Sequence, residues 1–181
     1  MPELAQSSIT GRTPGAKPVR IVSRDHVVRV VWWPSHGRLG RVVEHATTVQ
    51  VRWGDADPAG IAFYPRFFEW YDIATEALFA SLGLTWAEAF PRYGIVGVPI
   101  LEAGSRFVSP VRYGDAVTVR TRVAWVKDKT FRVEHEIAVG GRPCAEGFEV
   151  RAWVARPEAP GARLRALPIP PDVVAKLTGR A

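Results

Sequence analysis

The sequence predicts an α+β fold in which one long amphipathic helix is covered by an antiparallel sheet. Apolar residues recur at three- and four-residue steps after Pro65, which is the period of a helix with one buried face. Several strand-like runs then follow one another, separated by turn residues. Wrapping consecutive strands around a single helix buries both apolar surfaces, so we expect this arrangement.

The first strand and the helix have clear boundaries. "TTVQVRW" (47–53) alternates like a half-buried strand and leads into a turn rich in Pro and Gly. Pro65 suits the first turn of a helix, since it needs no N–H there. The apolar stripe ends at Leu82, and Gly83 is a plausible stop.

The second half of the chain has the pattern of a meander. A looser segment, "TWAEAFPRYG" (85–94), comes before it. Four strand-like runs follow, at 95–109, 116–125, 130–139 and 145–155. In the second run Val117, Val119 and Thr121 share one face. The other face holds Thr118, Arg120 and Arg122, as in a half-solvated antiparallel strand.

Composition sets limits on the kind of protein. The 181 residues are enough for one domain with a real core, and the hydrophobic fraction of 47% is globular. We find no apolar run that could span a bilayer and no secretory signal pattern. The single cysteine, Cys144, excludes an internal disulfide and suits a reducing compartment, so we expect a cytoplasmic location. We expect Cys144 to be a small buried or half-buried filler.

The net charge of +6 is concentrated in the N-terminal part. Residues 1–43 carry 7 Lys or Arg and 2 Asp or Glu, whereas residues 44–181 carry 17 and 16. We therefore expect a basic extension over 1–43, disordered or partly ordered, a folded domain over 44–175 and a C-terminal tail over 176–181. The extension is either incidental, for example a start-site artefact, or an arm that reaches nucleic acid or an anionic surface. We expect no nucleic-acid partner and no stable membrane insertion.

The segment "GDADPAGIAFYPRF" (54–67) carries more than a turn requires. Asp-Pro-x-Gly is ordinary turn chemistry, so Asp57 could be no more than an Asx-turn residue. Its position just before a helix N-terminus also allows a chemical role. Asp55, two residues earlier, fits local support of the turn.

Five segments resemble, in order and spacing, the hotdog-fold acyl-CoA thioesterases, in particular the 4-hydroxybenzoyl-CoA thioesterase group. These segments are 54–67, "GIVGVPI" (94–100), "RFVSPVRYGD" (106–115), "KDKTFRVEH" (127–135) and "LRALPIP" (164–170). The resemblance implies a curved antiparallel sheet around the helix that starts at Pro65. It also implies a homodimer or homotetramer with active sites at subunit interfaces. Coenzyme A is part of the substrate, no other cofactor is implied, and no zinc-type Cys/His spacing is present.

The resemblance gives roles to the residues around the helix start. Asp57 takes the place of the catalytic carboxylate, and the backbone N–H near Tyr64 would polarise the thioester carbonyl. Unpaired amides and the partial positive charge at a helix N-terminus suit an oxyanion. Pro58, Ala59 and Gly60 permit a close approach of the substrate. Asp57 could attack the carbonyl carbon directly or deprotonate a water, and the sequence leaves both routes open.

The resemblance also implies other substrate contacts, and some of these residues have an alternative, purely structural interpretation. Asp72 matches a position that binds the substrate's phenol in the 4-hydroxybenzoyl group, but it also fits a solvated helix face. A Tyr at position 64, where related short-chain enzymes carry His, favours an aryl substrate. Lys127, Lys129 and Thr130 match the nucleotide-contacting loop, or form a solvated hairpin turn.

One histidine, His135, is a further candidate for a functional role. His135 shares a strand face with apolar residues, so we interpret it as a hydrogen-bonded core residue rather than a member of a catalytic triad.

The favoured function is hydrolysis of an aryl-CoA, such as 4-hydroxybenzoyl-CoA. The alternatives are a short- or medium-chain aliphatic acyl-CoA thioesterase and a non-catalytic acyl-CoA-binding module.

Overall fold

The computed structural model describes residues 22–23, 26–27, 42–155, 159 and 163–180. The chain divides into two units, 1–38 and 39–181. In the first unit, β1 (Val22–Ser23) pairs antiparallel with β2 (His26–Val27). Apart from these two strands and residues 42–43, the predicted extension lies outside the described residues.

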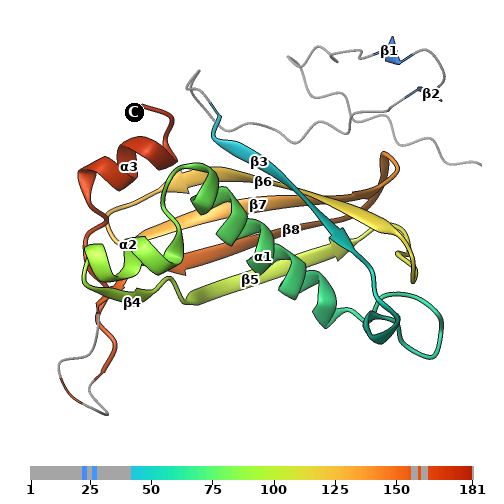
Figure 1. Cartoon of the computed structure of the whole chain (residues 1–181), viewed down its shortest axis with the longest axis horizontal. Coiled ribbons are helices and arrows are strands. Elements are labelled where there is room, and N and C mark those ends of the chain that lie inside the picture. Colours follow the sequence, from blue (N-terminus) through green and yellow to red (C-terminus); the bar gives the residue numbers. More distant parts are fainter. Residues whose placement is uncertain (1–21, 24–25, 28–41, 156–158, 160–162, 181) are drawn as a thin grey trace, which may run out of the picture. The chain divides into compact units, whose positions relative to one another are not determined.

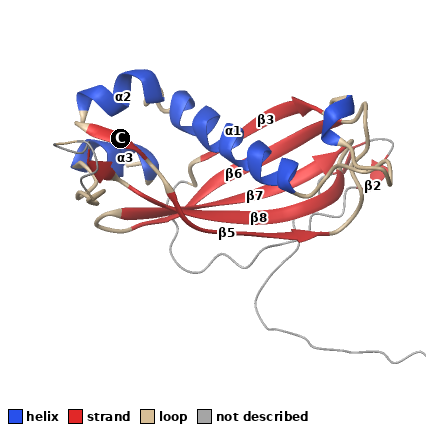
Figure 2. Ribbon diagram, turned by 90° about the horizontal axis from the view of Figure 1, so that it is seen from below, coloured by secondary structure: helices blue, strands red, loops and turns tan. Residues whose placement is uncertain are grey.

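The second unit is one long helix against a five-stranded antiparallel sheet (Figures 1 and 2). The strand order is β3-β6-β7-β8-β5. The strands are β3 (Glu44–Gln50), β5 (Ile100–Phe107), β6 (Ala116–Val126), β7 (Thr130–Val139) and β8 (Arg142–Ala152). The α+β fold predicted from the sequence is confirmed. Among the described residues, no helix is long and apolar enough to cross a membrane.

Helix α1 (Pro65–Ser81) matches its predicted bounds. Pro65 occupies the first turn, Leu82 is the C-cap, and Gly83 adopts a left-handed φ of +67° just beyond the end. The apolar stripe faces the sheet and is buried: Phe67, Trp70, Tyr71, Ala74, Thr75, Leu78 and Phe79. The same agreement holds for β6, where Val117, Val119 and Thr121 are fully buried.

Two segments differ from the predicted pattern. The stretch expected to be loose contains α2 (Trp86–Arg92), although Pro91 lies within it. The Thr85 carbonyl accepts the N–H groups of Glu88 and Ala89, and Ala89 is buried in the core, so packing outweighs the low helix propensity of proline.

The run over 95–109 is two strands rather than one. β4 (Ile95–Gly97) ends before Pro99 and pairs with β9 (Val154–Ala155), whereas β5 belongs to the main sheet. Pro99 cannot donate to a ladder, which favours a break at this point. Helix α3 (Pro171–Leu177) crosses the predicted limit at residue 175 and contributes two buried side chains to the core.

A polar layer separates two apolar clusters beneath α1. The first cluster includes Phe67, Trp70 and Ala74 of the helix, and the second includes Leu78 and Phe79 together with residues of α2 and α3. Between them lie the buried polar side chains of the structure: Thr75, Thr121, His135, Glu149 and Arg151.

Candidate active site

The loop that follows β3 brings Asp57 to the start of α1. It opens with a short 3₁₀ helix, η1 (Trp53–Asp55), and closes on itself through backbone bonds. The Asp57 N–H donates to the Ile61 carbonyl at 2.9 Å, and the Gly60 N–H donates to the Asp57 carbonyl at 2.9 Å. Gly60 has a φ of +72°, which a side chain would oppose. This tight turn requires the glycine.

The Asp57 carboxylate takes part in the turn and keeps one oxygen available. Its Oδ1 accepts the Ala59 N–H at 2.8 Å, which is the Asx-turn bond expected of an ordinary turn residue. In residues 42–155 no side chain or amide donates to Oδ2. The turn role and a chemical role are therefore compatible.

The backbone at the helix start leaves one amide unused. Pro65 has no N–H, and the N–H groups of Arg66 and Phe67 donate to the carbonyls of Phe63 and Tyr64 at 2.9 and 3.2 Å. The Tyr64 N–H has no acceptor among the described residues. It is thus a donor at the positive end of α1, where an oxyanion is favoured.

Asp55 is engaged in local contacts. Its Oδ2 accepts the Arg52 N–H at 2.7 Å, and its Oδ1 lies 3.4 Å from Nε of Arg66. Arg66 also pairs with Glu69 at 2.7 Å. These contacts support the loop and leave Asp55 less available than Asp57.

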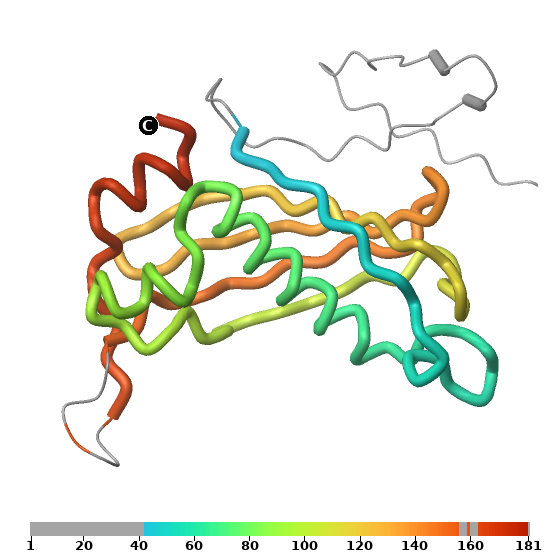
Figure 3. The backbone as a smooth tube through the Cα atoms, in the orientation of Figure 1, coloured from blue at the N-terminus to red at the C-terminus, as the bar shows by residue number. Residues whose placement is uncertain are grey.

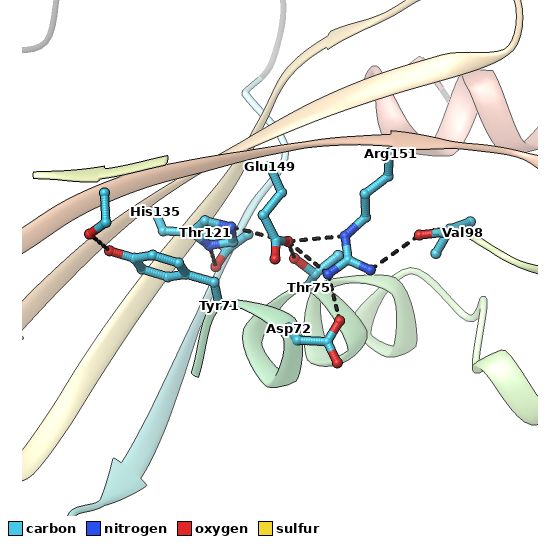
Figure 4. A network of polar contacts seen from close by, with 9 residues as sticks. Tyr71, Asp72, Thr75, Val98, Thr121, His135, Glu149 and Arg151 are labelled. Carbon is cyan, nitrogen blue, oxygen red and sulfur yellow. Dashed lines mark hydrogen bonds and ion pairs between the residues drawn. The ribbon is translucent and has the colours of Figure 1, made fainter. Parts of the chain in front are cut away.

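Asp72 lies on α1 and is held by a buried arginine of β8 (Figure 4). Its Oδ1 accepts from Nη2 of Arg151 at 2.5 Å, and half of its side chain is exposed, whereas that of Arg151 is 3% exposed. Arg151 also donates to Oε2 of Glu149 at 2.9 and 3.0 Å. Asp72 therefore does not simply lie in solvent on a polar helix face.

His135 lies deeper in the same layer and is a buried, hydrogen-bonded core residue, as predicted. Its Nδ1 is 2.8 Å from Thr121 Oγ1, and its ring stacks on Tyr71 at 4.5 Å. Burial lowers the pKa of His135, so the ring is neutral at physiological pH. Cys144 is also buried, in agreement with its predicted role as a filler.

The charge of Glu149 is stabilised by its neighbours. Burial alone would raise the pKa of this carboxyl, but the contact with His135, the charge of Arg151 and the hydrogen bond from Thr75 outweigh burial and lower it. His135 Nε2 lies 3.5 Å from Glu149 Oε2, which is a long contact. Glu149 is therefore an ionised partner for Arg151.

Sequence reasoning missed Glu149, Arg151 and Thr75. A signal was present, because a carboxylate and a guanidinium two residues apart in "FEVRAW" must share one face of a strand. Nothing in the sequence shows that this face lies under α1.

The predicted nucleotide loop lies far from Asp57 within one chain. The turn holding Lys127, Lys129 and Thr130 follows β6, whereas the Asp57 loop packs beside the start of β6, with the Ala62 N–H bonded to the Val111 carbonyl at 2.8 Å. Figure 3 shows these loops at opposite ends of the sheet. The 11 residues of β6 span roughly 33 Å. Over the described part of the chain, no group of three His, Cys, Asp or Glu could hold a metal ion.

An antiparallel sheet wrapped around one central helix is the hotdog architecture. The model of the thioesterase-like superfamily matches residues 51–177. The chain belongs to this superfamily and is an acyl-CoA thioesterase.

Individual relatives agree with this assignment. A 4-hydroxybenzoyl-CoA thioesterase from a Pseudomonas species is 31% identical over 131 residues, covering 69% of this chain and 91% of the relative. A 1,4-dihydroxy-2-naphthoyl-CoA hydrolase from a Synechococcus species is 27% identical over 68% of this chain and 92% of its own length.

Solved structures show the same likeness. The structure of a gentisyl-coenzyme A thioesterase is 36% identical, with a TM-score of 0.63, and the match covers 71% of this chain and 98% of that one. A mutant 4-hydroxybenzoyl-CoA thioesterase complexed with 4-hydroxybenzoyl-CoA is 29% identical, with a TM-score of 0.68 and coverage of 75% and 99%.

Proposed function

We propose that this thioesterase hydrolyses the CoA thioester of a hydroxylated aromatic acid, with 4-hydroxybenzoyl-CoA as the leading substrate. The observation that carries the proposal is that Asp57, with one carboxylate oxygen available, lies in the loop that leads to the unused Tyr64 N–H at the start of α1. The relatives named above act on three acyl groups that are all hydroxylated and aromatic. Asp72, with half of its side chain exposed, is an acceptor suited to such a hydroxyl.

The chemistry follows from these groups. The Tyr64 N–H stabilises the negative charge that develops on the carbonyl oxygen, and one such donor is worth roughly 3–4 kcal/mol in acyl-transfer sites. Oδ2 of Asp57 either attacks the carbonyl carbon and forms a mixed anhydride that water then hydrolyses, or takes a proton from an attacking water. In both routes the C–S bond breaks and CoA leaves as a thiolate that is then protonated. No cofactor is required.

We further propose that the working unit contains at least two copies of the chain. Lys127, Lys129 and Thr130 lie about a strand's length from Asp57 in one copy, so a second copy would supply the contacts to the nucleotide of the same substrate. Exposed lysines offer charge to its phosphates, although each such contact is modest.

A thiol-release assay on wild type and Asp57→Asn tests the catalytic assignment. We expect Asp57→Asn to lose at least about 100-fold in turnover, because an amide can neither attack nor take a proton. Binding of the acyl-CoA, measured by calorimetry, should survive. Asp55→Asn is the control and should retain most of its turnover. Near-wild-type turnover of Asp57→Asn would transfer the role to another group, and first to Asp55 if its variant is inactive.

The same assay across several acyl groups tests the substrate class. We expect 4-hydroxybenzoyl-, gentisyl- and 1,4-dihydroxy-2-naphthoyl-CoA to be hydrolysed faster than benzoyl-CoA and than a six-carbon aliphatic acyl-CoA. A clear preference for the aliphatic thioester would overturn the aryl assignment and support the aliphatic alternative.

A further inference from the structure

The buried ion pair of Glu149 and Arg151 is an unusual feature for the centre of a small domain. The Glu149 side chain is fully buried and that of Arg151 is 3% exposed. Two further atoms are buried without a hydrogen bond of normal geometry in the described structure. They are Glu149 Oε1 and His135 Nε2, and the latter lies 3.5 Å from Glu149 Oε2. Desolvating such a pair often costs as much as its attraction returns, and incompletely satisfied networks are costly. Stability alone is therefore a poor reason for this arrangement.

The geometry indicates what the pair accomplishes. The guanidinium of Arg151 is fixed on its inner side, with Nε and Nη2 on Glu149 Oε2 and Nη1 on the Val98 carbonyl at 3.2 Å. Glu149 is fixed in turn by Thr75 Oγ1 at 2.8 Å. Each nitrogen of Arg151 is thus committed, and Nη2 also reaches out of the core to Asp72. Figure 4 shows this line of contacts running from β8 to α1.

The line ends at a half-exposed carboxylate. Asp72 Oδ1 is occupied by Arg151, and its side chain is 50% exposed. In the described structure no donor reaches Asp72 Oδ2. A carboxylate only accepts hydrogen bonds, so this oxygen suits a ligand that presents an O–H or N–H and repels a ligand that presents a second carboxylate.

We propose that Arg151, braced by Glu149 and Thr75, is a positioning residue for acyl recognition. It sets the orientation of Asp72, and the oriented Asp72 selects acyl groups that carry a hydroxyl donor. This inference rests on the proposed function, because it assumes that the acyl group meets Asp72. Arg151 itself acts only through Asp72.

The test compares kcat/KM for 4-hydroxybenzoyl-CoA and benzoyl-CoA in wild type and Arg151→Met. We expect the ratio of the two values to fall about 10-fold in the variant, mainly through KM for the hydroxylated substrate. Arg122→Met is the matched control, since Arg122 pairs with Glu134 at 2.7 Å on the other face of the sheet. It should leave the ratio unchanged.

A second variant and a double mutant keep the test decisive if Arg151→Met folds poorly. Arg151→Lys keeps the charge, but one ammonium cannot reach Glu149, the Val98 carbonyl and Asp72 together, so the ratio should still fall. In an Asp72→Asn background, replacing Arg151 should change the ratio no further.

Failure of the Arg151 inference and failure of the proposed function would give different results. A folded Arg151 variant that slows both thioesters equally, or a full additional effect in the Asp72→Asn background, would overturn this inference alone. A wild type that hydrolyses neither aryl thioester would overturn the proposed function instead.

Discussion

At residue scale, Gly147 is what allows Tyr71 to lie against the sheet. Gly147 is paired with His135 on one side and Ser105 on the other, and the Tyr71 ring lies directly over it. A Cβ at this position would come within 2.5 Å of two ring carbons of Tyr71. Tyr71 is completely buried, stacked on His135 and hydrogen-bonded to Ser105 at 2.8 Å, so it cannot easily move aside.

We therefore predict that Gly147→Ala lowers the free energy of unfolding by about 1–3 kcal/mol, the usual cost of overpacking. Denaturant unfolding measures it. Gly54→Ala is the control, because a Cβ there would meet no atom within 4 Å. Equal stability of the two variants would contradict a rigid Tyr71.

His135 makes the stability of the fold depend on pH. Burial lowers its pKa below the ordinary 6.5, so the unfolded chain takes up a proton at a higher pH than the folded chain does. Stability is therefore lost as the pH falls below about 6.5, and it increases with pH until both states are neutral. The pKa of Glu149 is lowered from 4.5, so its own contribution is lost only at more acidic pH.

The expected result is that His135→Gln flattens the dependence of unfolding free energy on pH between about 5 and about 7. Each unit of pKa difference corresponds to about 1.4 kcal/mol. The same substitution at the half-buried His45 of β3 serves as the control and should keep the slope. A wild-type slope in His135→Gln would mean that another group titrates in this window.

At element scale, the sequence predicts the regular parts of the fold and not the exceptions. The stripe of α1 and the alternation of β6 are read correctly because one face of each is buried against a single neighbour. α2 was missed because its helicity depends on tertiary packing that outweighs Pro91. The break between β4 and β5 depends on β9, whose paired residues are 57 and 60 positions away in the sequence.

The candidate site also has one part that the sequence predicts and one part that only the tertiary structure shows. Asp57 and Tyr64 lie in one contiguous motif, so their proximity is local and can be expected from sequence. The link from Glu149 and Arg151 to Asp72 joins residues 77 and 79 positions apart, through the docking of α1 on the sheet. Only the tertiary structure establishes that contact.

At the scale of the whole molecule, the length of the sheet limits what one copy can do. β6 places the Asp57 loop near its first residue and the Lys127 turn after its last. If the substrate's reacting end and nucleotide are held by different copies, a two-fold arrangement creates two equivalent composite sites. Such sites can be tested by mixing defective copies, because each hybrid then contains one intact site and one doubly defective site.

We predict that Asp57→Asn co-expressed with a Lys127→Ala, Lys129→Ala variant gives a higher kcat/KM than either parent alone. Removing both lysines should lower kcat/KM about 10-fold, as expected for paired phosphate contacts. With random pairing, half of the dimers are hybrids, so kcat/KM at low substrate should reach about a quarter of wild type. If each site were contained within one copy, kcat/KM would reach only about a twentieth of the wild-type value. The control is Asp57→Asn co-expressed with a variant that carries all three substitutions, which should give no recovery. An activity equal to the average of the two parents in the main experiment would contradict a shared site.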